Sequence, residues 1–178
     1  MQSNAASSRG FTLLELMVGI TVLGILLGLG VPAFNEIIRN NRVAAQTNEL
    51  ITALSLARSE ASKRGMPVSI CASNSTQNGC ADDDEDNWGN GWFVFSDRTG
   101  VAGEIDDDDE VLQRWRAASG GLQLATNDIG FVRFGPDGAL LSNAVVFNLQ
   151  HEQCSGENLR QISIVATGRA NLAKVSCP

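Results

Sequence analysis

The chain has 178 residues, with 20 acidic residues against 13 Lys or Arg, so its formal net charge at pH 7 is −7. This length allows one domain and an appendage. So acidic a chain should not adhere broadly to nucleic acid or anionic lipid head groups, because both bind basic surfaces. We interpret the acidity as a contribution to solubility.

A long apolar segment, residues 11–31, follows a short polar stretch, and Glu15 is its one charged residue. As an α-helix it would span roughly 30 Å, the thickness of the hydrocarbon core of a bilayer. A carboxylate at the centre of such a helix costs about 2.5–3.5 kcal/mol, so Glu15 is expected to have a function.

Three interpretations of this segment are open. A cleaved secretory signal fits poorly, because Arg9 is the only charge before the run and no small-residue cleavage site closes it. A plain membrane anchor leaves Glu15 unexplained. The third interpretation rests on a resemblance of the sequence at the start of this segment to a known targeting signal.

The sequence GFTLLEL, from Gly10 to Leu16, resembles the class III signal of type IV pilins and type II secretion pseudopilins. The resemblance implies that residues 1–10 are a leader, cut between Gly10 and Phe11 by a prepilin peptidase that N-methylates Phe11. A free α-amino group is cationic and poorly placed in an apolar bundle. Glu15 would neutralise such a group. The resemblance implies that this glutamate pairs with the adjacent subunit during assembly.

Helical periodicity continues beyond the apolar run. Residues 32–65 are amphipathic, and Gly65 with Pro67 ends the pattern, so we predict one helix over residues 11–64. Pro32 should kink or loosen it, because proline removes a backbone hydrogen bond. Pro32 also matches a proline that is frequent in pilins, where it is linked to partial unwinding in the filament.

Short β-prone runs separated by turns occupy residues 66–178. They predict strands over residues 68–72, 92–96, 111–117, 121–125, 131–134, 145–149 and 161–166 and near residues 170–175, with a turn at Pro136-Asp137-Gly138. The fold class is therefore α+β: a long N-terminal α-helix packed by its C-terminal half against an antiparallel β-rich head. That is a type IV pilin-like architecture.

Two further motifs restrict the resemblance to one family of such proteins. The stretch NGWFVFSD ends at Asp97, and LSLARSEA covers residues 54–61. Both are similar to motifs of the GspH/FimT family of minor pilins and pseudopilins. Together with the leader and helix, this resemblance covers most of the chain.

The four cysteines are Cys71, Cys80, Cys154 and Cys177. Without a C-x-x-C pair, and with His151 as the only histidine, they do not fit a structural zinc site. An even number downstream of a membrane segment suggests disulfides in an oxidising compartment. Three pairings are possible; the local pairs Cys71–Cys80 and Cys154–Cys177 are the simplest, and free thiols are the alternative.

Two acidic clusters, residues 82–86 and 106–110, raise the possibility of calcium, which takes six to eight oxygen ligands. Asp97, Glu104, Asp106, Asp107, Asp108 and Asp109 could contribute oxygens. The spacing departs from the EF-hand pattern, so a solvated loop is the favoured interpretation, with no resident cofactor or metal.

No catalytic constellation is evident. His151 has no nucleophile beside it, and Ser155-Gly156 is not a nucleophile elbow. We therefore predict a non-enzymatic protein, with Trp88, Trp92 and Trp115 packing in the core or on a sheet face.

A partial Gly-Arg element lies near the C-terminus. Some family members that serve natural transformation carry a G-R-x-R element that contacts DNA; here Gly168 and Arg169 match, but Asn171 stands where the second Arg would be. Lys174 and Arg160 could add positive charge. Because phosphate binding needs several cations, DNA binding is a minority hypothesis.

The resemblance implies a minor pilin, held in the bacterial inner membrane by a single pass with its C-terminal head in the periplasm. It would then join the type IV pilus, near the tip in a priming complex. Expected partners are other minor pilins or pseudopilins, the major pilin, the prepilin peptidase and inner-membrane lipid. Alternatives are the minor pseudopilin H of type II secretion and a DNA-binding minor pilin of natural transformation.

Overall fold

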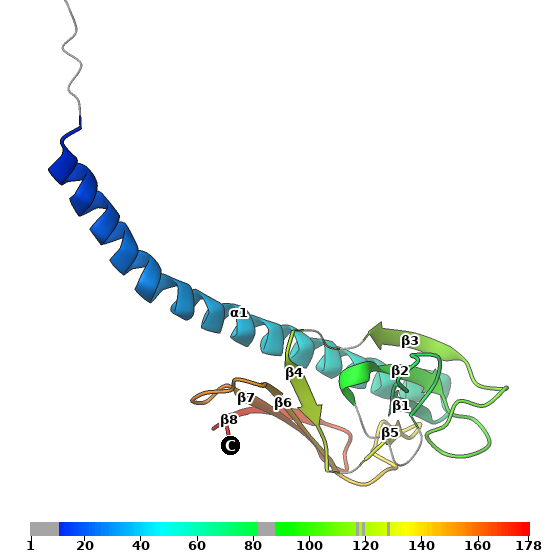
Figure 1. Cartoon of the computed structure of the whole chain (residues 1–178). Helices are drawn as coiled ribbons and strands as arrows, with labels where there is room; N and C mark the ends of the chain where they lie inside the picture. Colours follow the sequence, from blue (N-terminus) through cyan, green and yellow to red (C-terminus); the bar gives the residue numbers. More distant parts are fainter. Residues whose placement is uncertain (1–10, 82–87, 117, 119, 128) are drawn as a thin grey trace, which may run out of the picture. The chain divides into compact units, whose positions relative to one another are not determined.

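The computed structural model describes residues 11–81, 88–116, 118, 120–127 and 129–178, without the side chains of residues 29–33. In that part of the chain a helix, α1 (Leu13–Arg64), is followed by strands β1 to β8 (Figure 1). The chain divides into two compact units, Met1–Ile38 and Arg39–Pro178.

The helix α1 begins two residues later than predicted. Thr12 caps it: the Thr12 hydroxyl accepts a hydrogen bond from the Glu15 N–H at 3.2 Å. The helix ends at Arg64 as predicted, where Gly65 adopts a φ of 66° and donates its N–H to Ala61 O at 3.0 Å. Position 32 is helical, but the Pro32 side chain lies outside the description, so local loosening there stays a prediction.

The strands of Arg39–Pro178 form two antiparallel sheets of four. The first has the order β3-β2-β1-β5, built from β1 (Val68–Ala72), β2 (Gly91–Ser96), β3 (Val111–Arg116) and β5 (Phe131–Phe134). The second has the order β4-β6-β7-β8, built from β4 (Leu122–Ala125), β6 (Val145–His151), β7 (Leu159–Ile164) and β8 (Ala170–Val175). Figure 1 shows both sheets beside the C-terminal part of α1.

The predicted strands all exist; β1, β5 and β8 have the predicted bounds, and the other five are shifted. β6 runs on to His151, beyond the predicted end at residue 149, because His151 pairs with Leu122 of β4. β7 covers Leu159–Ile164 rather than residues 161–166, because Val165 and Ala166 belong to the turn before β8. A short 3-10 helix, Trp88–Asn90, was not predicted.

One core joins the helix to both sheets. The buried residues of α1, such as Leu50, Leu54 and Ala61, contact one face of each sheet, which contributes Ile70, Val94, Phe134, Phe147 and Ile162 among others. Trp88 and Trp92 are fully buried and Trp115 is partly buried, as predicted. The head is therefore an antiparallel β structure assembled on the amphipathic half of α1.

The first sheet has a second, smaller core on its other face. Cys71, Phe93 and Phe95 are buried there, and Cys80, Ile105 and Phe131 pack against them. The loops that follow β1 and β2 supply Cys80 and Ile105. Both faces of β1 and β2 are thus covered, which explains why every residue of these strands is buried.

Candidate functional site

The start of α1 places Glu15 in the first helical turn. Thr12 and Glu15 stand in the T-x-x-E spacing of a capping box, and the Thr12 hydroxyl satisfies the Glu15 N–H. A carboxylate in a first turn also interacts favourably with the helix dipole. Phe11 directly precedes this turn with 81% of its surface exposed. Gly10 and the predicted leader lie outside the described residues.

The described large apolar residues of α1 between Leu13 and Leu27 are all exposed, on every side of the helix. So much contiguous exposed apolar surface marks a site of interaction with lipid or with other protein chains. The charged carboxylate of Glu15 lies at the N-terminal end of this surface.

In the part of the chain that the structure describes, no helix meets the length and hydropathy that a membrane crossing requires.

In the head, Arg58 of the LSLARSEA motif joins α1 to two turns. Its Nε donates a hydrogen bond to Gly138 O at 3.0 Å, and its Nη2 donates to Thr167 O at 3.1 Å. The first turn follows β5 of the first sheet, and the second connects β7 to β8 of the second sheet. One guanidinium, whose donors form a rigid planar fork, therefore holds the helix and both sheets together.

The two turns have the same design, and it explains the glycine of the Gly-Arg element. In the second turn Gly168 donates its N–H to Val165 O, and Val165 donates to Arg169 O, so the turn is a three-residue hairpin loop with a glycine bulge. Gly168 adopts a φ of 73°, and a Cβ there would lie 2.0 Å from Gly138 O of the other turn. Gly168 is thus required by backbone geometry and close packing.

The three cations predicted to contact DNA do not form one cluster. Arg160 and Lys174 are cross-strand partners on β7 and β8. Arg169 lies at the other end of β8, five residues from Lys174 and so about 17 Å away along an extended strand. The structure brings two of the three together, and whether they bind DNA stays a prediction.

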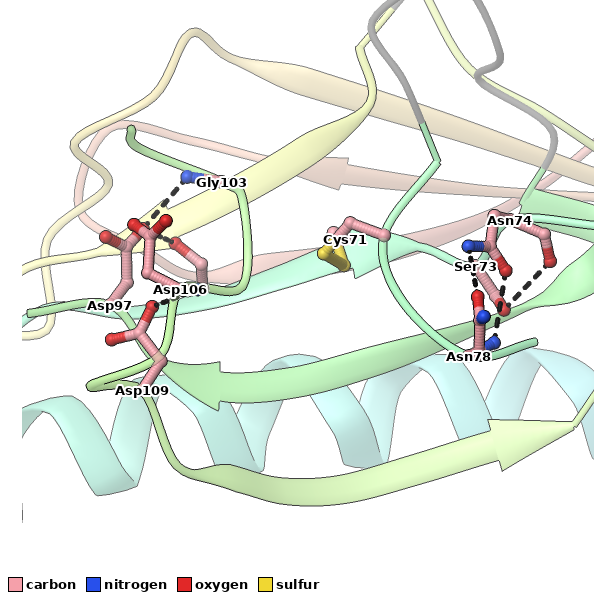
Figure 2. The surroundings of a disulfide bond; sticks show 10 residues. Cys71, Ser73, Asn74, Asn78, Asp97, Gly103, Asp106 and Asp109 are labelled. Atoms are coloured by element: carbon pink, nitrogen blue, oxygen red, sulfur yellow. Dashed lines mark hydrogen bonds between the residues drawn. A yellow bond between two sulfur atoms is a disulfide. The ribbon is translucent and has the colours of Figure 1, made fainter. Parts of the chain in front are cut away.

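The acidic loop after β2 is organised by its own hydrogen bonds. Asp97, only 1% exposed, accepts a hydrogen bond from the Gly103 N–H at 3.0 Å (Figure 2). It also accepts from the Ser69 hydroxyl at 2.5 Å and pairs with Arg133 at 2.9 Å. Asp109 accepts from the N–H groups of Arg98 and Asp106. These carboxylates tie the loop to the sheet.

Among the described residues, no group of three or more His, Cys, Asp or Glu side chains is placed to hold a metal ion. The other acidic cluster considered for calcium, residues 82–86, lies outside the described residues.

The local disulfide pairing is confirmed. Cys71 and Cys80 are bonded, as are Cys154 and Cys177, and no cysteine is free. The first bond closes the loop after β1 over the smaller core (Figure 2). The second ties the C-terminal residues to the β6–β7 turn, where Cys177 N–H also donates to Gly156 O at 2.9 Å.

Sequence reasoning missed the roles of Asp97 with Arg133 and of Arg58. Asp97 directly follows β2, whereas Arg133 lies on β5, 36 residues further along the chain. The available signals were a carboxylate soon after the apolar run WFVF and a single arginine inside the run FVRF. Such signals indicate buried charge but do not identify its partner.

Comparison with solved structures defines the class of protein. The crystal structure of the type IV minor pilin FimU of Pseudomonas aeruginosa in space group P21 matches with a TM-score of 0.59 at 21% identity, covering 75% of this chain and 89% of that chain. The minor pseudopilin EpsH from the Type 2 Secretion System of Vibrio cholerae matches with a TM-score of 0.52 at 12% identity, covering 75% and 97%. The fold is that of a type IV pilin-like subunit.

Family models give the particular family. The model described as Type II transport protein GspH matches residues 46–168, and that of the prokaryotic N-terminal methylation motif matches residues 6–31. A comparison with curated protein sequences gave no match. The chain belongs to the GspH family, carries a prokaryotic N-terminal methylation motif, and has the fold of minor pilins and pseudopilins such as FimU and EpsH.

Proposed function

We propose that the chain is a non-enzymatic minor pilin of the type IV pilus system. It is cut between Gly10 and Phe11 by a prepilin peptidase that N-methylates Phe11. Residues 11–31 hold it in the inner membrane, with the head in the periplasm, until it enters the fibre. There it joins other minor pilins and the major pilin, near the tip in a priming complex.

The observation that carries this proposal is the first turn of α1. A carboxylate stands four residues beyond Phe11, at the start of the stretch of α1 from Leu13 to Leu27, whose large apolar residues are exposed on all sides. In lipid such a carboxylate destabilises the segment, whereas in a bundle of helices it can neutralise the N-terminal ammonium of a neighbouring subunit. The arrangement therefore supports a segment that serves first as an anchor and then as a packing surface.

The test is Glu15→Ala in the producing cell. We expect the leader to be cleaved normally, by mass spectrometry of the mature N-terminus, while the amount of the chain in sheared fibres falls strongly. Glu36→Ala is the matched control, because Glu36 is also an exposed glutamate on α1. Normal incorporation of the Glu15→Ala chain would contradict the role given to Glu15.

The main alternative is the minor pseudopilin of type II secretion, which the likeness to EpsH keeps open. A deletion strain separates the two: loss of pili with normal secretion supports the pilus, and loss of secretion with normal pili supports the pseudopilus. The same strain scored for DNA uptake tests a role in natural transformation.

Binding of DNA by the head is a second candidate, supported by the adjacent cations Arg160 and Lys174. It predicts that the chain binds duplex DNA at low salt and that Arg160→Ala and Lys174→Ala each weaken binding. The absence of binding at low salt would remove this candidate, because non-specific affinity rests on phosphate contacts.

A further inference from the structure

The last strand of the head, β8, has an open edge. β8 is hydrogen-bonded to β7 on one side and stands at the end of the second sheet; no other described strand pairs with it. An open edge presents unpaired N–H and C=O groups and can accept a further strand. The question is whether β8 is built to accept one.

The β7–β8 turn fixes which groups of β8 face outward. Val165 donates its N–H to Arg169 O, so the pair nearest the turn is hydrogen-bonded. Hydrogen-bonded and non-hydrogen-bonded pairs alternate in an antiparallel ladder. The registered pairs of β8 therefore leave the N–H and C=O groups of Ala170, Leu172 and Lys174 on the open edge, while those of Asn171, Ala173 and Val175 bond to β7.

The three other sheet edges are protected. β3 has a register shift where it pairs with β2, and its Arg114 donates to Gln77 O and lies over the Phe93 ring. Bulges and engaged charges of this kind discourage strand pairing. β4 and β5 have only four residues each, whereas β8 has six residues in regular register.

The side chains beside the open edge are apolar at one end and cationic at the other. Ala170, Leu172 and Lys174 lie on the sheet face that carries the buried residues Ile162 and Ile164 of β7. Leu172 is nevertheless 50% exposed. A hollow of about 200 Å³ adjoins the start of β8, and its lining is partly apolar and partly cationic: Ile51, Leu54, Ser55 and Arg58 of α1 with Gly168, Arg169 and Ala170.

The cationic end has an uncompensated charge. Lys174 stands directly opposite Arg160, and like charges in that position destabilise a strand pair. β8 itself has no acidic residue, and none of the ion pairs between described residues involves Arg160, Arg169 or Lys174. A carboxylate placed beside Lys174 would relieve this repulsion.

We propose that the open edge of β8 binds an extended segment of another polypeptide, which adds to the second sheet as a fifth, antiparallel strand. The segment has apolar residues at the two alternate positions beside Ala170 and Leu172, and an acidic residue beside Lys174 and Arg160. Main-chain hydrogen bonds supply affinity, and the alternate side chains supply specificity. Only the source of the segment, another subunit of the fibre, rests on the proposed function.

The competing explanation is that Lys174 protects the edge, since a lysine on an edge strand commonly prevents association. The two explanations differ in what a charge reversal does. If Lys174 only protects the edge, Lys174→Glu leaves it equally closed to every peptide. If Lys174 selects an acidic segment, the reversal weakens acidic peptides and admits basic ones.

The experiment uses the full mature chain in detergent micelles and short fluorescent peptides. The probe has glutamate, valine and valine at alternate positions with threonine between them, and the control peptide has lysine in place of glutamate. We expect the acidic probe to bind about tenfold more tightly than the basic control. Amide hydrogen exchange should show new protection at Ala170, Leu172 and Lys174 when the acidic probe is bound.

Two variants and a control complete the design. Leu172→Pro removes an N–H that faces the open edge and not one that pairs with β7, so the fold should persist while probe binding is lost. Lys174→Glu should reverse the preference between the two peptides. Arg116→Glu, the same change on the protected edge strand β3, should leave both affinities unchanged.

Four outcomes would overturn the proposal: no binding of the acidic probe, equal binding of both peptides, Lys174→Glu without effect, or protection elsewhere in the head. Binding of duplex DNA in place of the probe, or a dimer of the chain that Leu172→Pro abolishes, would assign the edge to another partner. None of these measurements uses assembled fibres. A failure of peptide binding can therefore be distinguished from a failure of the proposed role in fibre assembly.

Discussion

The two ends of α1 differ in what covers them. Between Leu13 and Leu27 the large apolar side chains are exposed, whereas between Val43 and Ala61 a stripe of them is fully buried against the sheets. Both stretches are helical and rich in apolar residues. The difference teaches that the C-terminal stretch is stabilised by the chain's own head, while the apolar surface of the N-terminal stretch is left uncovered by the head.

The largest effect on stability should come from truncating a leucine side chain in the buried stretch of α1. The same truncation in the exposed stretch is its control. Leu54→Ala removes a side chain only 2% exposed and should lower the free energy of unfolding by about 2–5 kcal/mol. Leu23→Ala makes the same change at an exposed position and should alter it by less than about 0.5 kcal/mol. Thermal unfolding in detergent measures both, and equal losses would contradict the comparison.

Removing the second disulfide should have the next largest effect. Cys154→Ser with Cys177→Ser opens a link with a sequence separation of 23, which should lower the stability of the head by about 3 kcal/mol. The helical signal of the N-terminal stretch should not change, because the bond lies wholly within Arg39–Pro178. Circular dichroism during thermal unfolding follows both regions; an unchanged midpoint would contradict the prediction.

Arg58→Ala should cost somewhat less, about 2–3 kcal/mol, because it removes the donors to Gly138 O and Thr167 O. Arg58→Lys should recover only part of this loss, since one ammonium does not reproduce a planar fork that serves two carbonyls. Chemical denaturation gives both values. Full rescue by lysine would show that charge alone matters at this position.

The smallest effect should come from the last turn of α1. The pKa of the Glu60 carboxyl is lowered from its ordinary value of 4.5, chiefly by a hydrogen bond from Arg64 and then by one from Lys63. A lowered pKa in the folded state adds stability at higher pH, and this contribution is lost as pH falls through the folded-state pKa.

Melting temperatures of the parent chain and Glu60→Gln should therefore differ slightly at pH 7 and converge as the pH falls below the ordinary carboxyl pKa of 4.5. In a background that carries Lys63→Gln and Arg64→Gln, and so lacks both donors to Glu60, the same comparison should show no such convergence. A difference that grows as pH falls would contradict the assignment.

The sequence was sufficient for features with local causes. The helix end at Gly65, the turn at residues 136–138, the strands and the local disulfides follow from turn residues, periodicity and short separations. The order of strands in the two sheets did not follow, because β1 pairs with β5 some 60 residues later. The helix starts at Leu13 and not at Phe11 because the Thr12 hydroxyl caps its first turn.

The residues of the candidate site could be predicted from the sequence only where their role depends on neighbouring residues in the chain. Phe11 and Glu15 are recognisable from a short contiguous motif. The Gly-Arg element resembles a ligand motif in sequence, and in the fold Gly168 serves a turn that packs on Gly138, 30 positions earlier. Asp97 was grouped with an acidic loop, although its partners Ser69 and Arg133 lie on other strands. Sequence proximity does not reveal such contacts.

The double hydrogen bond of Arg58 also bears on how the protein is made. Its two acceptors lie 80 and 109 residues further along the chain. During synthesis from the N-terminus, α1 is therefore complete long before Arg58 can engage the second sheet. The head can close on the helix only near the end of translation, so the bare N-terminal stretch meets its surroundings first.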